Sequence, residues 1–403
     1  MTYRKFKADY LFTGREMAGE NAVLVTEEDG TIHTILPLSE AGEGVEVLKG
    51  ILSPGFVNCH CHLELSHMKG RVPEKTGLVD FLLAVMGGRN QGAGDEKTRM
   101  DAIADAEQSM LDCGIVAVGD ICNTIDTITQ KVMGRLFYHN FIETMGFSEQ
   151  GAAARFEQGR TIFETFSQAY TLPIEANSLV PHAPYSVSFR LFQLIANFPG
   201  NHVLSIHNQE TEAENEFYRS GQGDLLRLYK AIGLDTSFFT GTGQRSLASY
   251  LPHFYRNQSL ILVHNVATTE EDLRQAGAER DRKQTAGPNL YFCLCPNANL
   301  YISGQLPDVD LLTRSAVTIV LGTDSLASNH RLDILEEAKT LQARFPGLTT
   351  ETLLQWATAN GAEALQLDGV LGSFLPGKQP GVVLIEGGEG ERLTAGARAI
   401  RVI

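Results

Sequence analysis

The stretch Ser53-Pro-Gly-Phe-Val-Asn-Cys-His-Cys-His-Leu-Glu64 places two histidines, His60 and His62, directly behind a short apolar run. In a β-strand the side chains of residues i and i+2 point to the same side, so the two imidazoles would leave the strand end together, about 6–7 Å apart along the chain. This spacing suits two ligands of one metal ion, and it also fits two ordinary strand histidines. The other strands of the chain decide between these interpretations.

Length and charge narrow the range of folds and functions. The chain has 403 residues and a formal net charge of −15. It can bury a large core and exceeds the usual size of one compact domain, so a (β/α)₈ barrel with a small appendage would fit. The acidic balance and the lack of a basic block argue against a nucleic-acid partner. No apolar run reaches the ~20 residues that span a bilayer, and no apolar signal core follows the first ten residues. We therefore expect no membrane partner.

The six cysteines are sparse for this length. Cys59 and Cys61 form one pair at Cys-x-Cys spacing within an apolar run, and Cys293 and Cys295 form another. A structural zinc site would more typically use pairs of Cys-x-x-Cys. Buried free thiols in a reducing cytoplasm explain the pattern better, so we expect a cytoplasmic protein.

Short strand-like segments lie at both ends of the chain. The N-terminal ones cover 8–13, 21–26 and 31–36, and the C-terminal ones cover 382–385 and 399–403. They are rich in β-branched and aromatic residues and are separated by turn signals. We therefore expect one small sheet domain built from both termini, over residues 1–53 and 371–403.

Residues 54–370 alternate between apolar runs and helical stretches. This alternation predicts a closed parallel barrel of the α/β class. The apolar runs expected to form its strands are 55–57, 114–120, 136–142, 174–180, 202–207, 259–264, 289–295 and 316–324.

Several of these strands end in polar residues, at the side of a barrel where catalytic groups lie. In addition to His60-x-His62, strand ends carry His182, His207, His264 and Asp324. One such histidine would usually be a hydrogen-bonded core residue, but five at four strand ends together with an aspartate indicate a metal site. Nitrogen and oxygen ligands suit zinc, and also Fe²⁺. Asp324 would have a catalytic role as well, because an aspartate that helps to hold the cation can accept a proton from bound water. A metal of this kind lowers the pKa of bound water toward ~7 and provides hydroxide at neutral pH.

Glu210 follows His207 by three residues, at the expected turn from strand to helix. Its carboxylate is well placed to move a proton beside the metal. Alternatively, it is a first-turn helix acid stabilised by the helix dipole. We interpret Glu212, Glu214 and Glu216, which continue the acidic run, as ordinary helix acids.

The ordered set of motifs resembles the amidohydrolase superfamily, in its cytosine deaminase-like, chlorohydrolase-type branch, over nearly the whole chain. This resemblance implies a distorted TIM barrel with a β-sandwich made from both termini. The matching segments are Pro54–His62, Val180–Ser186, Ile206–Thr211, Leu262–His264, Cys295–Asn299 and Leu321–Asn329.

The resemblance also implies a role for each site residue. The residues that would bind one metal ion, most readily Zn²⁺ with Fe²⁺ as the alternative, are His60, His62, His207 and Asp324. Glu210 would be the general acid/base, His264 would orient the hydroxide, and His182 would contact the substrate. Two-metal relatives usually carry a carboxylated lysine at the end of strand 4, and 174–184 contains no lysine.

The expected reaction is hydrolytic deamination of an amino-substituted N-heterocycle. Hydroxide adds to the amino-bearing ring carbon, Glu210 protonates the neighbouring ring nitrogen, and ammonia leaves. An adenosine-type nucleoside such as aminodeoxyfutalosine is the expected small-molecule substrate. Relatives acting on nucleosides often have a tryptophan after strand 1, where this chain has Leu78–Leu82.

Three further residues are candidates for substrate contacts. Phe81 and Tyr185 would stack on a base, but ordinary packing explains both equally well. Glu143 would bind a ribose hydroxyl or a ring amine, and the alternative is a plain acid at a strand end. The same site could instead displace chloride or an alkylamine from a triazine-like ring, or cleave a cyclic amide. A third alternative is a non-catalytic relative kept for binding. Such barrels are commonly homodimers.

Overall fold

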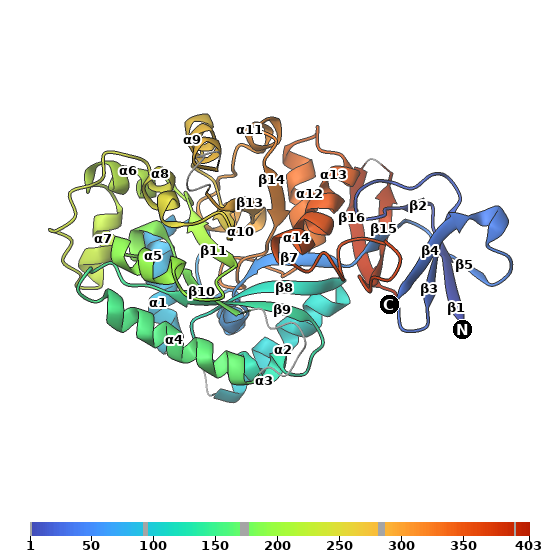
Figure 1. Cartoon of the computed structure of the whole chain (residues 1–403), viewed down its shortest axis with the longest axis horizontal. Helices are drawn as coiled ribbons and strands as arrows, with labels where there is room; N and C mark the ends of the chain where they lie inside the picture. The colour runs from blue at the N-terminus through green and yellow to red at the C-terminus, as the bar shows by residue number, and fades with distance from the viewer. Residues whose placement is uncertain (1, 92–95, 170–176, 281–286, 391) are drawn as a thin grey trace.

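The computed structural model describes residues 2–91, 96–169, 177–280, 287–390 and 392–403. In Figure 1 the chain has a large helix-covered part and a smaller sheet region, and both termini lie in the smaller region. Within the described ranges, no helix is long and apolar enough to cross a membrane.

The smaller region contains two four-stranded sheets. The first has the order β4-β3-β1-β5, and the second has the order β16-β15-β6-β2 and therefore joins both ends of the chain. Side chains from both sheets share one buried core, which includes Phe6, Leu24, Leu52 and Val382. The strand bounds are β1 (Tyr3–Lys7), β2 (Tyr10–Leu11), β3 (Ala22–Glu27), β4 (Ile32–Pro37), β5 (Val45–Val47), β6 (Ile51–Pro54), β15 (Val382–Glu389) and β16 (Arg392–Arg401).

The larger part contains two four-stranded parallel sheets, ordered β10-β9-β8-β7 and β11-β12-β13-β14. The strands fall on the predicted apolar runs, although the first residues of the run 174–180 lie outside the described ranges. Their bounds are β7 (Phe56–Cys61), β8 (Ile115–Cys122), β9 (Phe137–Thr144), β10 (Asn177–Pro181), β11 (Val203–Asn208), β12 (Ser259–His264), β13 (Asn289–Leu294) and β14 (Thr318–Leu321).

Backbone contacts connect these two parallel sheets at both of their outer strands. The His207 amide of β11 donates to the carbonyl of His182, just after β10, at 2.9 Å. On the other side, the Thr323 amide donates to the His60 carbonyl of β7 at 3.0 Å. Since His60, His207 and His182 take part in these contacts, the places where the sheets meet are also the places that bring the predicted site residues together.

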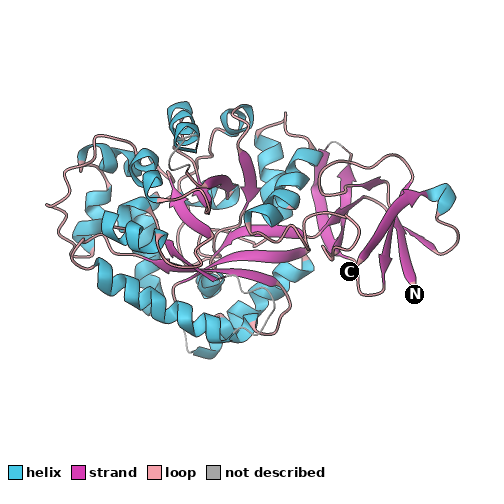
Figure 2. Ribbon diagram, viewed as in Figure 1, coloured by secondary structure: helices cyan, strands magenta, loops and turns pink. Residues whose placement is uncertain are grey.

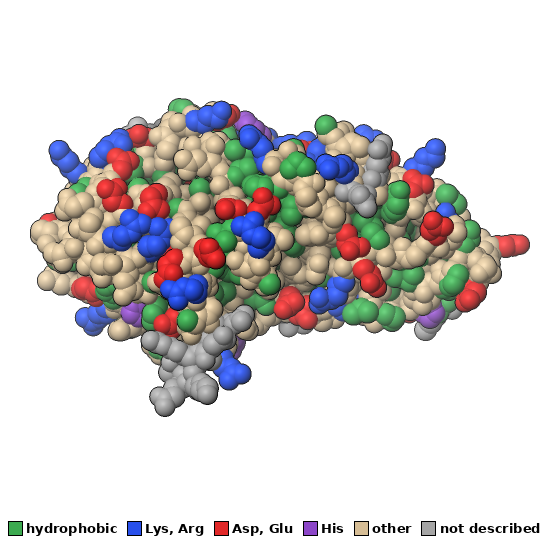
Figure 3. All heavy atoms as spheres, turned by 90° about the horizontal axis from the view of Figure 1, so that it is seen from above, with side chains coloured by type: hydrophobic (Ala, Val, Ile, Leu, Met, Phe, Trp, Pro, Cys, Tyr) green, Lys and Arg blue, Asp and Glu red, His purple; other side chains and the backbone are tan. Residues whose placement is uncertain are grey.

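Helices cover the parallel sheets, as Figure 2 shows. β8 is buried along its whole length, as expected for a strand covered on both faces. Figure 3 shows acidic and basic side chains interspersed on the face that it draws. The helix bounds are α1 (Leu78–Gln91), α2 (Glu96–Asp112), α3 (Ile128–Lys131), α4 (Ala152–Ala169), α5 (Phe189–Ala196), α6 (Glu212–Ser220), α7 (Leu225–Ala231), α8 (Ser246–Tyr250), α9 (Glu270–Arg280), α10 (Pro296–Ile302), α11 (Val309–Arg314), α12 (Ile334–Arg344), α13 (Thr350–Ala357) and α14 (Ala359–Ala364).

Candidate metal and catalytic site

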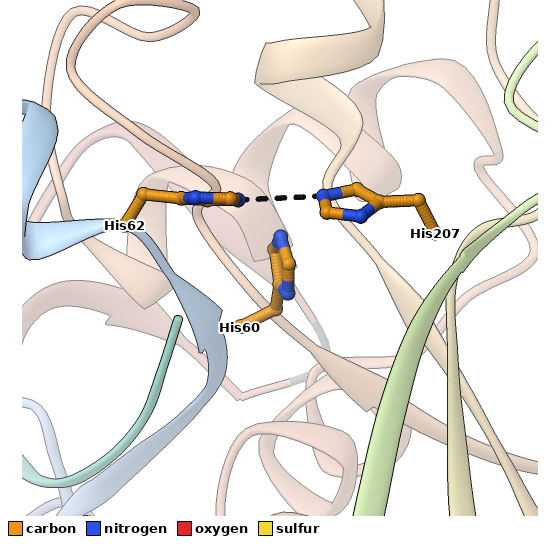
Figure 4. A group of neighbouring side chains, drawn as sticks. All are labelled: His60, His62 and His207. Carbon is orange, nitrogen blue, oxygen red and sulfur yellow. Dashed lines mark hydrogen bonds between the residues drawn. The ribbon is translucent and has the colours of Figure 1, made fainter. Parts of the chain in front are cut away.

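Three histidine rings and one carboxylate converge at the carboxyl ends of the strands. His60, His62 and His207 each offer one ring nitrogen within 4.8 Å of the others. The Nε2 atoms of His62 and His207 lie 3.3 Å apart, and Figure 4 shows these rings facing each other with His60 pointing between them. Asp324 Oδ1 lies 3.7 Å from His60 Nε2 and 3.4 Å from His62 Nε2. The structure therefore brings the four predicted ligands together.

The chemistry of this group fits a transition-metal ion. Both ring nitrogens of His60 are buried without a hydrogen-bond partner among the described residues, an arrangement that costs about 1–3 kcal/mol per group unless something binds there. His207 donates its Nδ1 proton to the carbonyl of His182 at 2.7 Å, which leaves Nε2 as the ligand atom. Three imidazole nitrogens and one carboxylate oxygen are the donors that zinc or Fe²⁺ accepts.

The backbone is unusual at the site residues. His264 and Asp324 adopt left-handed conformations with φ of 77° and 56°, and Gln209, beside Glu210, has φ of 46°. Such conformations are unfavourable for residues other than glycine and are retained where function requires them. They occur where the chain leaves three of the strands, next to the candidate site.

Glu210 and His264 face each other beside the metal-binding group. Glu210 Oε1 lies 3.8 Å from His264 Nε2, and both side chains are buried. Asn299 donates from Nδ2 to His264 Nδ1 at 2.9 Å, so the neutral ring carries its proton on Nε2, toward Glu210. Burial lowers the pKa of His264 to about 3, which keeps the ring neutral at physiological pH.

The pKa of Glu210 is raised well above its ordinary value, first by burial and then by repulsion from Asp324 and Glu214. A carboxyl group with a raised pKa can both accept and release a proton near neutral pH. This property suits the predicted acid/base role better than that of an ordinary helix acid.

A cavity of about 520 Å³ opens onto these residues. Its lining includes all four predicted substrate contacts, Phe81, Glu143, His182 and Tyr185. Many of the remaining lining residues are apolar and belong to α1, α7 and the segments around them, namely Leu78, Leu82, Val85, Met86, Leu228, Tyr229, Ile232 and Leu234. The cavity therefore has a polar floor and apolar walls, which is typical of sites for small organic ligands.

Glu143, at the end of β9, lines the cavity beside His207. Its Oε2 accepts a hydrogen bond from Asn123 Nδ2 at 3.0 Å, while Oε1 lies 3.6 Å from His207 Nδ1 and has no hydrogen-bond partner among the described residues. Glu143, His182 and His207 also form a group of potential ligands. Because His207 Nδ1 is already donated to the His182 carbonyl, this second group is a poor site for another ion.

Sequence reasoning missed several residues that support the site. Glu64 Oε2 accepts from the amides of Asn123 and Thr124 and so fixes the loop after β8 beside the cavity. Glu214, interpreted from the sequence as an ordinary helix acid, is fully buried, and its Oε1 accepts from the Gln209 amide at 2.9 Å. That interpretation was wrong for Glu214. Glu214 is followed by Phe217 and Tyr218 on the same buried helix face, a periodicity that could have revealed it.

Gly322 provides a test of how tightly the site is packed. A Cβ atom at this position would lie 2.8 Å from Cys293 Sγ and 2.9 Å from His60 Cβ. We expect Gly322→Ala to lower the free energy of unfolding by about 1–3 kcal/mol and to weaken zinc binding, because the packed interior and His60 must shift. Denaturant titration and zinc titration measure both effects. Gly347→Ala, where the new Cβ meets nothing within 4 Å, is the control, and equal stability of the two variants would contradict this expectation.

Comparison with known proteins identifies the family. Residues 51–399 match the model of the Amidohydrolase family. The chain belongs to this family. The family predicted from the sequence motifs is therefore confirmed.

Two relatives of this amidohydrolase are deaminases by name. The 5-methylthioadenosine/S-adenosylhomocysteine deaminase of Teredinibacter turnerae is 26% identical over 380 residues, which cover 88% of this chain and 77% of that protein. The crystal structure of Helicobacter pylori aminofutalosine deaminase in complex with methylthio-coformycin superposes with a TM-score of 0.82 at 21% identity, covering 99% of this chain and 100% of the other. The predicted α/β fold class is confirmed, and the relatives belong to the predicted reaction class, hydrolytic deamination.

A second related structure contains a metal. The adenosine deaminase from Xanthomonas campestris, solved with bound zinc, superposes with a TM-score of 0.69 at 22% identity, covering 95% of this chain and 84% of that one. That neighbour thus holds one of the two metals considered for the histidine and aspartate pattern of this chain.

Proposed function

We propose that this amidohydrolase uses one divalent metal ion to deaminate an adenosine-type nucleoside, with release of ammonia. The observation that carries the proposal is the convergence of three histidine nitrogens within 4.8 Å, beside a facing Glu210 and His264, on the floor of a cavity of about 520 Å³. The names of the relatives, which include a 5-methylthioadenosine deaminase and an aminofutalosine deaminase, support the choice of substrate class.

The proposed ligands of the ion, Zn²⁺ with Fe²⁺ as the alternative, are His60, His62, His207 and Asp324. When bound, the ion supplies a Lewis acid that lowers the pKa of water toward ~7. Ser328 donates to Asp324 Oδ2 at 2.6 Å and holds that carboxylate in place, with Oδ1 toward the histidines.

Glu210 takes a proton from the attacking water and delivers it to the ring nitrogen beside the amino-bearing carbon. The C–O bond forms at that carbon. The proton left on the new hydroxyl then moves through Glu210 to the amino nitrogen, the C–N bond breaks, and ammonia leaves as the ring carbonyl forms. His264, neutral and protonated on Nε2, donates a hydrogen bond to the attacking oxygen. The buried position of both groups keeps bulk water out of these proton transfers.

The proposed substrate contacts lie in the same cavity. His182 and Glu143 would hydrogen-bond polar groups of the substrate, and the free Oε1 of Glu143 suits a ribose hydroxyl or an amine. Phe81 and Tyr185, which both line the cavity, would pack on the base. The apolar cavity wall around Ile232 and Leu234 is suited to a non-polar substituent on the sugar.

We also propose the finer architecture expected from the sequence. The backbone contacts of His207 with His182 and of Thr323 with His60 support closure of the two parallel sheets into a distorted (β/α)₈ barrel over residues 54–370. The shared core of the two terminal sheets supports a β-sandwich domain over residues 1–53 and 371–403. A homodimer and a cytoplasmic location stay predictions.

A screen of the zinc-reconstituted protein tests the function. We expect ammonia release from adenosine and from its 5′-thioether derivatives, with little or none from cytosine, guanine or adenine. Chlorinated triazines and a cyclic amide belong in the same screen, because the same residues could displace chloride or open an amide ring. Release of chloride without ammonia from any compound would overturn the deaminase proposal. A protein that binds less than a tenth of an equivalent of zinc would instead be a non-catalytic relative.

A further inference from the structure

A buried ion pair lies behind the metal-binding group, on the side of β8. Lys131 of α3 and Asp120 of β8 are both fully buried, and Lys131 Nζ lies 2.5 Å from Asp120 Oδ2. Lys131 Nζ also donates to Asn140 Oδ1 at 2.8 Å and lies over the ring of Tyr138. The buried ammonium group therefore contacts a carboxylate, an amide oxygen and an aromatic ring.

Stability alone is a weak reason for such a pair. Moving two charges out of water costs more than their attraction usually returns, and well-packed apolar residues of similar volume often replace a buried pair without loss. The pair therefore points to a second task for one of its members. The contacts of Lys131 include Asp120, Asn140 and Cys122, and none of these three is a proposed metal ligand.

Asp120 has that second task. Its other oxygen, Oδ1, accepts a hydrogen bond from the amide of Leu63 at 2.8 Å. Leu63 directly follows His62, one of the proposed metal ligands. The carboxylate therefore holds the backbone at the point where the chain leaves the His-x-His segment.

The pairing of β7 with β8 is irregular near His62, which explains why the backbone there needs an additional contact. β7 and β8 pair as Asn58 with Val118 and Cys61 with Asp120, so β7 has one residue more than β8 between these two pairs. An extra residue of this kind interrupts the ladder and re-aims the side chains around it. The irregularity covers His60, and Asp120 stands opposite its far end.

We propose that Asp120, whose charge Lys131 neutralises, is a positioning residue whose Oδ1 acceptor sets the orientation of His62 for metal binding. It acts through the Leu63 amide and contacts neither the metal nor the substrate. The inference rests on the proposed metal site and goes beyond it, because Asp120 is neither one of the four proposed ligands nor Glu210.

Two double variants that differ only at position 120 test this role. D120N/K131M removes both charges and keeps an oxygen that can accept from the Leu63 amide. D120L/K131M removes both charges and that acceptor, with a side chain of similar volume. Zinc affinity of the metal-free proteins is measured by competition with a chelating dye, with melting temperature, kcat and KM measured in parallel. Hydrogen exchange of the Leu63 amide in the metal-free proteins gives a readout that does not depend on activity.

We expect D120N/K131M to bind zinc close to the wild-type affinity and D120L/K131M to bind it about 10–100-fold more weakly, as is typical when a group that orients a metal ligand is lost. In D120L/K131M the Leu63 amide should also exchange faster, and kcat should fall while KM holds. Equal zinc affinities in the two variants would overturn the positioning role. If D120L/K131M does not fold, D120N/K131M decides alone, since a tenfold loss of affinity despite the retained acceptor also overturns it. A wild-type protein that takes up no zinc would overturn the proposed function itself.

Discussion

Replacement of Glu210 by glutamine is expected to lower kcat by about 10²–10⁴-fold while the protein keeps its metal. Glutamine has the same shape and can still hydrogen-bond, but it cannot take up and release a proton. Glu210 faces His264 at 3.8 Å and is not one of the proposed ligands, so its loss should spare the metal group. Steady-state kinetics on the preferred nucleoside, together with the zinc content of the purified protein, measure both parts of the expectation.

Glu212→Gln is the matched control for this experiment. Glu212 lies two residues further along, with more than half of its side chain exposed, and pairs with Arg219 and Arg245 on the surface. Exposed pairs of this kind contribute little, so kcat should stay near the wild-type value. Turnover of the Glu210→Gln variant within a few fold of that control would remove Glu210 from the mechanism. Loss of zinc in the variant would instead make Glu210 part of the metal group.

The proposed metal ligands could be picked out from the sequence because each of them lies at the end of a recognisable apolar strand. In parallel α/β folds the carboxyl ends of the strands meet on one side, so His60, His207 and Asp324 are neighbours in space although 264 positions separate the first from the last. The local sequence pattern predicts where the strands lie, and the parallel arrangement of the strands then predicts that these side chains are neighbours. The contacts among their nitrogen and oxygen atoms agree with this expectation.

The supporting residues could not be predicted in the same way. Glu64, Asp120 and Lys131 look from the sequence like ordinary polar residues in loops or at strand ends. Their role depends on which backbone amide or charge they meet after folding, such as Leu63 for Asp120 and Asn123 for Glu64. The irregular register of β7 could not be predicted either. The sequence pattern of a strand predicts only a strict alternation of side chains, whereas the irregularity appears in the pairing of β7 with β8.

The apolar wall of the cavity could not be predicted from the sequence either. Phe81 and Tyr185 were identified as candidates near the strand ends, but the wall formed by Ile232 and Leu234 follows α7, far from any motif. Substrate preference depends on such walls, which vary in loops and short helices while the strand ends keep the metal chemistry. This explains why the reaction class could be predicted with more detail than the substrate.

Replacement of His207 by alanine is expected to have the largest effect on this amidohydrolase. The imidazole contributes one of the three nitrogens that lie within 4.8 Å of one another, and its Nε2 lies 3.3 Å from that of His62. Without it the site keeps two histidines and Asp324, one donor fewer than the proposed set, so we expect zinc to bind more weakly. Since a catalytic metal supplies several kcal/mol of transition-state stabilisation, kcat/KM should fall about 10³-fold or more.

His202→Ala is the control, because His202 directly precedes the same strand, β11, at its opposite end and is exposed. Zinc titration of the metal-free proteins should give one tight site for the wild type and the control, and a much weaker one for His207→Ala. The melting temperature without metal separates a lost ligand from a lost fold, because a ligand defect leaves it near the wild-type value. If His207→Ala binds zinc as tightly as the control, the ion is held elsewhere, and the proposed ligand set is wrong. If His207→Ala folds but loses both zinc and activity, the reaction requires the metal ion that the histidines at the strand ends are proposed to bind.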